Sequence, residues 1–192
     1  KIEKFSFRNK EEIEKSKSII RNKKFNISDI SSKVINRNPS GPFTTSTLQQ
    51  TASSRLGFGA SRTMQIAQKL YQGVEIEGET IGLITYMRTD GTNLSKDAVS
   101  AFRNYIKNEI GNNYLPENPL NYSGKKAKNA QEAHEAIRPT DIVRSPQDVK
   151  KYLSPDQNKL YNLIWSRALS SQMESAKFDR STITITSDNN DT

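Results

Sequence analysis

The sequence predicts an α+β protein, in which a mainly helical domain with a short strand pair is inserted into a partial β-rich domain. Two observations support this fold class. Extended patterns lie toward both ends of the chain, as KFNISDISSKVI and RSTITITSD, and helical patterns fill the centre between them. We therefore infer that residues 1–43 and 174–192 belong to one sheet-rich domain, and that residues 44–173 form the helical insert.

Residues 1–43 are expected to pass from extended to helical structure and back. KIEKFSF is typical of a strand, and NKEEIEKSKSIIRN is typical of a helix. Asn9 is the expected N-cap of this helix, with Glu12 three residues later in a capping-box arrangement. KFNISDISSKVI then returns to extended structure, and the turn-rich string NRNPSGPF predicts the boundary of the helical domain.

Apolar spacing and glycines predict the first two helices of the central domain. In TLQQTASSRLG, Leu48, Ala52 and Leu56 are four residues apart, and Gly57 is expected to end the helix. SRTMQIAQKLYQG repeats this pattern, from a predicted cap at Ser61 to another glycine. After it, VEIEGETIGLITYM predicts a hairpin-like pair of strands.

Three further helices are predicted from their caps. Ser95 is expected to open a helix whose apolar face is formed by Ala98, Val99, Phe102, Ile106 and Ile110. The serine–proline pairs at 145–146 and 154–155 each place proline at the first helical position. The second of these helices should reach about Met173, and residues 112–130 are expected to be a loop.

The composition favours a polyanionic partner and excludes several kinds of site. Lys and Arg number 29 against 21 Asp and Glu, which gives a net charge of +8. This balance favours nucleic acid, with an ordinary basic surface as the alternative. The absence of cysteine excludes zinc ribbons, thiol nucleophiles and disulfides within this chain. No membrane span or signal peptide is visible, and we expect a piece of a larger soluble protein.

The string IGLITYMRTDG carries the clearest chemical signal, since an apolar run leads to a tyrosine and, two residues later, an arginine. A tyrosine hydroxyl can attack a phosphodiester and hold the product as a phosphotyrosine ester. Free tyrosine, with a pKa of about 10, is almost fully protonated at neutral pH. A nearby arginine would stabilise both the phenolate and the charge on the phosphate oxygens, which its planar guanidinium can contact with two donors.

Tyr86 and Arg88 converge only if their segment is extended. Residues two apart in a strand share a face, so Met87 would then pack behind the pair, whereas the two side chains would diverge in a helix. The spacing also fits an ordinary strand with a half-buried ring and a surface charge. Spacing alone therefore leaves both interpretations open.

Three longer strings point to a known family: PFTTSTLQQTASSRLGFGASRTMQIAQKLYQG, GLITYMRTDGTNLS and QEAHEAIRPTDI. In this order they resemble the central part of the type IA DNA topoisomerases, and more closely the bacterial topoisomerase I branch. Topoisomerase III and reverse gyrase more often have another residue at the position of Met87. The strong match runs from Pro42 to Ile142. It implies that the helical domain holds the tyrosine and is inserted into a β-rich arch domain.

The resemblance also implies roles for single residues. Tyr86 is the expected nucleophile, which would attack single-stranded DNA and become linked to a 5′ phosphate. Arg88 would contact the scissile phosphate and stabilise the transition state, and Asp90 would hold local geometry or tune its neighbours. His134 is expected to bind nearby DNA phosphate, with a plain surface role as the alternative. Arg138 is either a DNA-binding residue or a structural partner for a carboxylate.

The sequence leaves the role of three further features open. A polar cluster either lines the DNA path or caps and covers a helix start: Thr44, Thr45, Gln49 and Gln50. The basic loop 124–131 either touches phosphates or is merely solvated. Gly91 stands where the family usually has serine, which puts a hydroxyl contact at this position in doubt, and the glycine would let the chain turn.

The resemblance implies a metal ion and partners outside this chain. Type IA chemistry uses an acidic Toprim domain, which binds Mg²⁺ and supplies a glutamate and a lysine. No D-x-D-x-E cluster occurs here, so we expect no metal ligands in this chain. The expected partners are single-stranded and negatively supercoiled DNA and the Toprim domain of the same protein. The expected location is the bacterial cytoplasm, at the nucleoid.

Three functions remain for comparison. The first is a topoisomerase that cuts one strand, passes another, reseals the break and relaxes negatively supercoiled DNA without ATP, with this chain inert alone. The second is a non-catalytic module that binds single-stranded nucleic acid, which the intact Tyr86, Arg88 and His134 disfavour. The third, a structural protein, would require all three motifs to be accidental.

Overall fold

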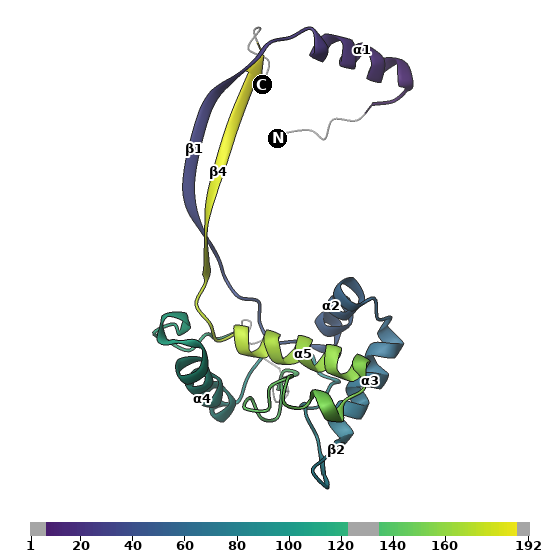
Figure 1. Ribbon diagram of the computed structural model, residues 1–192, viewed down its shortest axis with the longest axis vertical. Coiled ribbons are helices and arrows are strands. Elements are labelled where there is room, and N and C mark those ends of the chain that lie inside the picture. Colours follow the sequence, from purple (N-terminus) through teal and green to yellow (C-terminus); the bar gives the residue numbers. More distant parts are fainter. Residues whose placement is uncertain (1–6, 123–134, 188–192) are drawn as a thin grey trace, which may run out of the picture. The chain divides into compact units, whose positions relative to one another are not determined.

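The computed structural model describes residues 7–122 and 135–187, and the chain divides into two compact units (Figure 1). One unit comprises Lys1–Arg37 and Lys177–Thr192, and the other comprises Asn38–Ala176. Helices and two small two-stranded sheets build the described chain, which confirms the α+β fold class. The assignment of the first unit to a larger arch domain stays a prediction.

The first unit contains α1 (Lys10–Arg21), β1 (Phe25–Arg37) and nearly all of β4 (Ala176–Ser187). Asn9 caps α1 as predicted, since its side-chain oxygen accepts a hydrogen bond from the Glu12 amide at 2.9 Å. β1 and β4 pair as an antiparallel ribbon (Figure 1). The strand expected at KIEKFSF lies outside the described residues, apart from its last residue.

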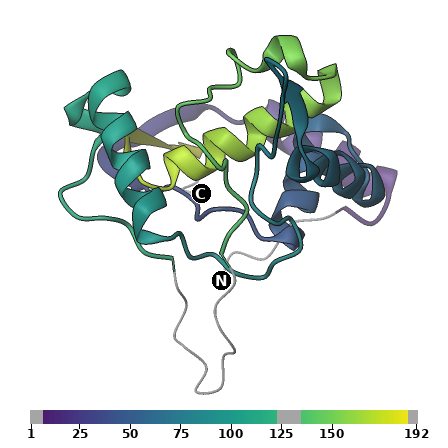
Figure 2. The ribbon, with the colours of Figure 1, turned by 90° about the horizontal axis from the view of Figure 1, so that it is seen from below.

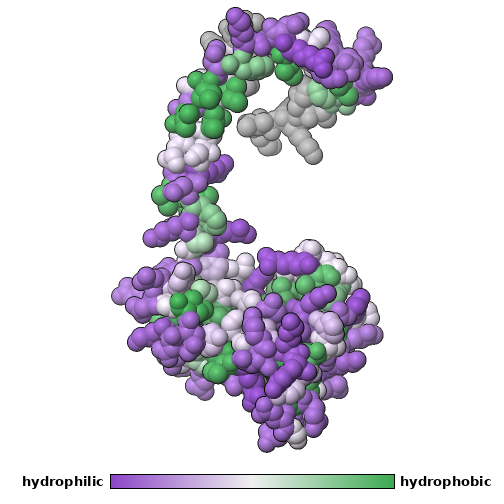
Figure 3. All heavy atoms as spheres, viewed as in Figure 1, coloured by the Kyte–Doolittle hydropathy of each residue, from purple (hydrophilic) through white to green (hydrophobic). Residues whose placement is uncertain are grey.

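Both strands of this ribbon expose apolar side chains (Figure 3). A two-stranded sheet has no second layer to cover either face, so these side chains stay in contact with solvent. They are Phe25, Ile27, Ile30, Val34, Phe178, Ile183 and Ile185.

The second unit opens with α2 (Thr45–Leu56), which ends at glycine as predicted. Leu48 and Ala52 are fully buried on one face of this helix. Gly57 follows with a φ of 70°, a left-handed conformation that glycine adopts without the strain of a side chain.

The next helix, α3 (Ala60–Gln72), begins earlier than its predicted cap. Gly59 is the N-cap, and the Thr63 amide donates to the Gly59 carbonyl at 2.9 Å to close the first turn. Ser61 therefore lies inside that turn, and the prediction that it caps the helix is wrong.

A short hairpin follows, with β2 (Val74–Ile76) paired antiparallel to β3 (Glu79–Ile81). The turn residues Glu77 and Gly78 have φ values of 52° and 90°. Two successive residues with positive φ are typical of the tight turn whose twist matches that of the strands. The strand pair is confirmed, but it is shorter than expected because β3 ends at Ile81.

Ser95 caps α4 (Lys96–Tyr105) as predicted, and the helix continues into a π-helix at Ile106–Ile110. The Gly111 amide donates to the first carbonyl of the π-helix at 2.8 Å, five residues back. This wider turn rotates the last residues away from the face that α4 buries. Ile110 is therefore 37% exposed, and the prediction that it shares the buried face is wrong.

Only the second of the two serine–proline pairs opens a helix. Ser154 forms a capping box at the start of α5 (Pro155–Ser170). Ser145 caps a single turn, in which its hydroxyl accepts from the Asp148 amide at 3.3 Å. The helix predicted at Ser145 is wrong, because the cap of α5 follows before a helix of ordinary length can form. Two short 3₁₀ helices occur at Asn112–Tyr114 and Lys150–Tyr152.

The second unit is built around α5, which lies between α3 and α4 (Figures 1 and 2). One part of α5 packs with α2 and α3 in the larger core, through Leu160, Tyr161 and Ile164. Its last turns pack against α4 and the π-helix in a smaller core, through Ala168 and Leu169. The segment after β3 also enters the larger core, through Leu83, Ile84 and Met87. The tyrosine-bearing segment is therefore anchored in the core.

Candidate active site

Tyr86 and Arg88 are both exposed in the segment that follows β3. The segment is not a regular strand, yet the burial of its side chains alternates. Met87 is 1% exposed and Thr89 is 8% exposed, whereas Tyr86, Arg88 and Asp90 are exposed. The chain bends at Thr85, Met87 and Arg88, so the extended run that was expected is interrupted. Met87 packs in the core between the two exposed side chains, and their convergence on one phosphate stays a prediction.

Gly82 allows this segment to approach α3 closely. The Leu83 amide donates to the Leu70 carbonyl at 2.8 Å. A Cβ atom at position 82 would lie 2.7 Å from the carbonyl oxygen of Tyr71, too close for any side chain. Glycine is therefore required here, and the contact sets the path of the chain just before Tyr86.

The ring of Tyr86 packs against that of Tyr71, which lies at the end of α3. The two ring centroids are 5.3 Å apart and the planes are inclined by 63°, an edge-to-face arrangement. Such a pair contributes about 0.5–1.5 kcal/mol beyond the burial of its area. Tyr86 remains 49% exposed, so its ring is supported on one side and accessible on another.

Arg88 borders two hollows in the surface. A hollow of about 480 Å³ at the start of α2 is lined by Thr44, Thr45, Ser46, Arg88, Thr89 and Asp90. A larger one, of about 880 Å³, runs along α3 and includes Arg62, Gln65, Gln68, Lys69 and Gln72. Within residues 7–122 and 135–187, the Arg88 guanidinium makes no hydrogen bond or ion pair. Its donors are therefore available to an anion.

Thr45 ties the start of α2 to the Arg88 segment. Its hydroxyl lies 2.8 Å from the Met87 carbonyl and 3.1 Å from the Thr89 carbonyl, and it accepts from the Thr89 amide at 2.8 Å. Thr44 caps α2 in a capping box with Thr47. The capping alternative for this polar cluster is therefore observed, and a role in the DNA path stays a prediction.

Asp90 lies at the rim of the smaller hollow, and Gly91 follows it. The Asp90 carboxylate makes no hydrogen bond or ion pair with the described residues. The Gly91 amide donates to the Thr89 hydroxyl at 3.0 Å. Gly91 is not among the described glycines with positive φ, and no turn is assigned at this position, so the backbone here does not require glycine.

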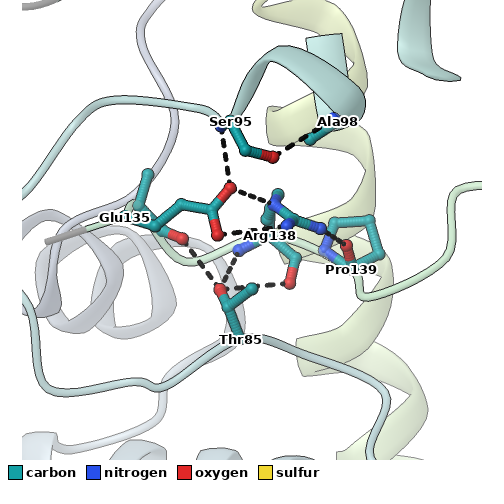
Figure 4. A network of polar contacts seen from close by, with 7 residues as sticks. Thr85, Ser95, Ala98, Glu135, Arg138 and Pro139 are labelled. Atoms are coloured by element: carbon teal, nitrogen blue, oxygen red, sulfur yellow. Dashed lines mark hydrogen bonds and ion pairs between the residues drawn. The ribbon is translucent and has the colours of Figure 1, made fainter. Parts of the chain in front are cut away.

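Arg138 is held by Glu135 (Figure 4). Its Nε donates to Glu135 Oε1 at 2.6 Å and its Nη2 donates to Oε2 at 3.0 Å. Its Nη1 donates to the Pro139 carbonyl at 2.9 Å, and the side chain is 15% exposed. Of the two alternatives for Arg138, the structure shows the partnership with a carboxylate.

Glu135 also contacts the start of α4, since its Oε1 accepts from the Ser95 amide at 2.9 Å. Burial alone would raise the pKa of Glu135. The hydrogen bonds and charge of Arg138, together with the Ser95 contact, outweigh burial, so the pKa lies below its ordinary value. The Glu135 carboxylate is therefore charged at neutral pH.

Two predicted contacts fall outside the described residues. His134 and the basic loop 124–131 belong to this part of the chain, so their proposed contacts with DNA phosphate stay predictions.

The described part of the chain also offers no metal site. It contains no group of three or more His, Cys, Asp or Glu side chains that could hold a metal ion. None of the helices in the same residues has the length and apolar character needed to cross a membrane.

Sequence reasoning missed three residues that shape the site. Tyr71 falls within the predicted helix SRTMQIAQKLYQG, and Gly82 falls within the predicted strand pair. Glu135 falls within the string QEAHEAIRPTDI, where no role is predicted for it. Its spacing of three residues before Arg138 was the one available signal, and such spacings are common.

The comparisons with known proteins point to one family. The family described as DNA topoisomerase matches residues 1–192. DNA topoisomerase 1 of Rickettsia bellii (strain RML369-C) is 51% identical over 189 residues, which cover 98% of this chain and 24% of that protein. DNA topoisomerase 1 of Xylella fastidiosa (strain 9a5c) is 49% identical over 167 residues, covering 86% and 20%.

A solved structure has the same fold. Full-length topoisomerase I from Thermotoga maritima, in a monoclinic crystal form, matches with a TM-score of 0.78 and 37% identity, over 99% of this chain and 29% of that one. This chain spans about a quarter of the length of the Rickettsia relative, whose matched share is 24%. Sequence, family and structure agree that the chain belongs to the bacterial topoisomerase I family of type IA DNA topoisomerases.

Proposed function

We propose that this chain is the tyrosine-bearing part of a type IA enzyme that cleaves one DNA strand, passes a strand through the break and reseals it. The net result would be relaxation of negatively supercoiled DNA without ATP. The observation that carries the proposal is the exposure of both Tyr86 and Arg88 on a segment that Met87 anchors in the core between them.

In the proposed cleavage step, the Tyr86 hydroxyl oxygen attacks the phosphorus of a phosphodiester in single-stranded DNA. The new bond joins the phenolic oxygen to phosphorus, and the bond from phosphorus to the 3′ oxygen breaks. The phenolic proton is lost, and the departing 3′ oxygen takes up a proton to become a hydroxyl. The other strand end stays linked to Tyr86 through its 5′ phosphate. Religation is the reverse reaction. Because one phosphodiester linkage replaces another in each step, no external energy source is needed.

Arg88 is proposed to stabilise the charge that develops on the phosphate oxygens. Its exposed guanidinium has no partner among the described residues and can offer two donors to one phosphate. Asp90 lies beside it at the rim of the same hollow, where a carboxylate can orient the arginine when DNA is bound. His134 is proposed to bind a phosphate of the same strand.

The chain is proposed to act together with a Toprim domain of the same protein. On the ground of the type IA resemblance, we assign Mg²⁺ and the catalytic glutamate and lysine to that domain. The chain alone is then expected to be inactive in cleavage. We place the protein with DNA in the bacterial cytoplasm. The alternative is a non-catalytic module that binds single-stranded nucleic acid, for which the net charge of +8 is also suited.

The test follows transfer of label from DNA to protein. Single-stranded DNA labelled at its 3′ end is mixed with Mg²⁺ and the full-length protein that contains this chain. In parallel, it is mixed with this chain, with and without a separately made Toprim fragment. Denaturing gels report the label on protein. We expect transfer with the full-length protein and none with the chain alone.

Two tyrosine variants identify the nucleophile. Tyr86→Phe should abolish transfer, whereas Tyr71→Phe keeps the neighbouring ring and should retain it. Persistent transfer in Tyr86→Phe would refute the assignment of the nucleophile. If the wild-type full-length protein binds single-stranded DNA but transfers no label, the binding module replaces the catalytic proposal.

A further inference from the structure

We propose that the Glu135–Arg138 ion pair positions Tyr86, by holding residues 135–139 against Thr85. The inference rests on the proposed function, since it concerns the geometry of the proposed nucleophile. Neither member of the pair contacts DNA in this proposal.

The pair fixes residues 135–139 to the start of α4 (Figure 4). Glu135 accepts from the Ser95 amide at 2.9 Å, and both of its oxygens accept from Arg138 at 2.6 and 3.0 Å. Arg138 also donates to the Pro139 carbonyl at 2.9 Å. The ion pair therefore holds residues 135–139 in a fixed shape and joins them to the N-cap of α4, Ser95, which lies 40 residues earlier in the chain.

The same segment holds Thr85 at three points (Figure 4). The Thr85 amide donates to the Arg138 carbonyl at 2.9 Å, and its hydroxyl donates to the Ala136 carbonyl at 2.8 Å. The Thr85 hydroxyl also accepts from the Arg138 amide at 3.0 Å. Every one of these bonds uses the backbone of the braced segment. A shift of that backbone would therefore move Thr85, and with it the main chain of Tyr86.

Tyr86 thus lies between two clamps. Thr85 is held on one side by the segment that the ion pair braces, and Met87 is held on the other by the Thr45 hydroxyl at 2.8 Å. The Tyr71 ring supports the side chain between them. The Tyr86 ring is about half exposed. The hydrogen bonds that hold Thr85 and Met87 therefore set the direction in which the Tyr86 hydroxyl points.

The geometry disfavours Arg138 as a phosphate ligand. Its Nε, Nη1 and Nη2 all donate to protein oxygens, and the side chain is 15% exposed. A phosphate would have to displace Glu135, which would leave a partly buried carboxylate unpaired beside another anion. Arg88 has the opposite character, with no described partner and an exposed side chain.

The test compares Glu135→Gln, Arg138→Gln and the double variant in the full-length protein. Arg144→Gln is the matched control, since Arg144 also pairs with an acid three residues earlier, Asp141 at 3.5 Å, without contacting Thr85. The rate of label transfer at saturating DNA and the Kd for single-stranded DNA at several salt concentrations are measured. All assays are run well below the Tm of each variant.

We expect each single variant to slow transfer by about 10- to 100-fold, the scale of a misplaced reacting group. The Kd should stay within about twofold, because the pair makes no DNA contact, and Arg144→Gln should match the wild type. The double variant should be no slower than the slower single variant, since the two residues act as one unit.

A second readout needs no catalysis. This chain is prepared with ¹³C-labelled tyrosine rings, and the NMR signal of Tyr86 is identified by its loss in Tyr86→Phe. Glu135→Gln and Arg138→Gln should shift or broaden that signal, whereas Arg144→Gln should leave it unchanged. This comparison still tests the pair if the wild-type protein transfers no label, so failure of the inference is distinguishable from failure of the proposed function.

Two results would overturn the inference. If Arg138→Gln weakens DNA binding and reduces the magnitude of the salt slope by about 0.7, while Glu135→Gln does not, Arg138 is a DNA contact. If transfer rates and the Tyr86 signal stay unchanged while only the Tm falls, the pair is a general stabilising contact.

Discussion

Arg88 and Arg138 carry the same guanidinium group, and their neighbours give it different uses. Arg88 is exposed and has no partner among the described residues. Arg138 is 15% exposed and held by Glu135. Removing Arg88 therefore takes a free charge from the surface, whereas removing Arg138 leaves a partly buried carboxylate without its partner.

At Arg88, an alanine substitution should separate activity from stability. We expect Arg88→Ala in the full-length protein to lower the rate of label transfer by about 10²- to 10³-fold, as for other transition-state donors. The free energy of unfolding should change by no more than about 0.5 kcal/mol, since no described contact is lost. Transfer assays and urea unfolding measure the two quantities, and a large loss of stability with normal transfer would contradict the proposed role.

At Glu135, stability should depend on pH in the acidic range. Its pKa is lowered in the folded state, so the Arg138 contact stabilises the fold at pH values above the ordinary carboxyl pKa of 4.5. That stabilisation is lost as the pH falls through the lower, folded pKa. The Tm difference between wild type and Glu135→Gln should therefore be largest near neutral pH and shrink as the pH falls below 4.5. A difference that is constant between pH 7 and pH 3 would contradict this.

At the scale of elements, side-chain caps decide where several helices start. Ser154 is the N-cap of α5, and α5 joins the two cores of the second unit. Ser61 was also predicted to cap a helix, but Gly59 is the cap of α3. The two serines therefore form a matched pair, in which only one satisfies otherwise unpaired helical amides.

The caps give a direct comparison of stability. Ser154→Ala should lower the free energy of unfolding by about 1 kcal/mol, the usual cost of losing a side-chain cap. Ser61→Ala should change it by no more than about 0.5 kcal/mol. Chemical denaturation of this chain, monitored by circular dichroism, measures both. Equal losses for the two variants would mean that the capping bond of Ser154 contributes nothing particular to α5.

At the scale of the whole molecule, charge is the property most relevant to the proposed DNA partner. The net charge is +8, and Lys69 and Arg88 border the same large hollow along α3. Hydrophilic residues cover most of the face of the helical unit seen in Figure 3. Such a surface binds polyanions through counterion release, which makes binding dependent on salt.

The affinity of this chain for single-stranded DNA should therefore fall as salt rises, with a linear relation between the logarithms of affinity and salt concentration. Lys69→Gln should reduce the magnitude of the slope by about 0.7, the share of one phosphate contact. Lys107→Gln, on the π-helix, should leave the slope unchanged. Fluorescence anisotropy at several salt concentrations measures both, and equal slopes for the Lys69 variant and wild type would exclude a DNA path along this hollow.

Local sequence patterns determined much of this protein. Several features were predictable because each depends on the backbone preferences of a few consecutive residues. They are the caps at Asn9, Ser95 and Ser154, the glycine that ends α2, and strand β4. The exposure of Tyr86 and Arg88 and the burial of Met87 between them also match the predicted pattern.

Only the tertiary structure decided the contacts between distant segments. Arg138 could pair with phosphate or with a carboxylate, and the choice depends on how the segments around Thr85, Ser95 and Glu135 meet. The need for glycine at position 82 arises from a Tyr71 carbonyl on another element. The physical reason is that a turn or cap is settled by nearby backbone groups, whereas a charged or crowded side chain is settled by whichever neighbours packing brings to it.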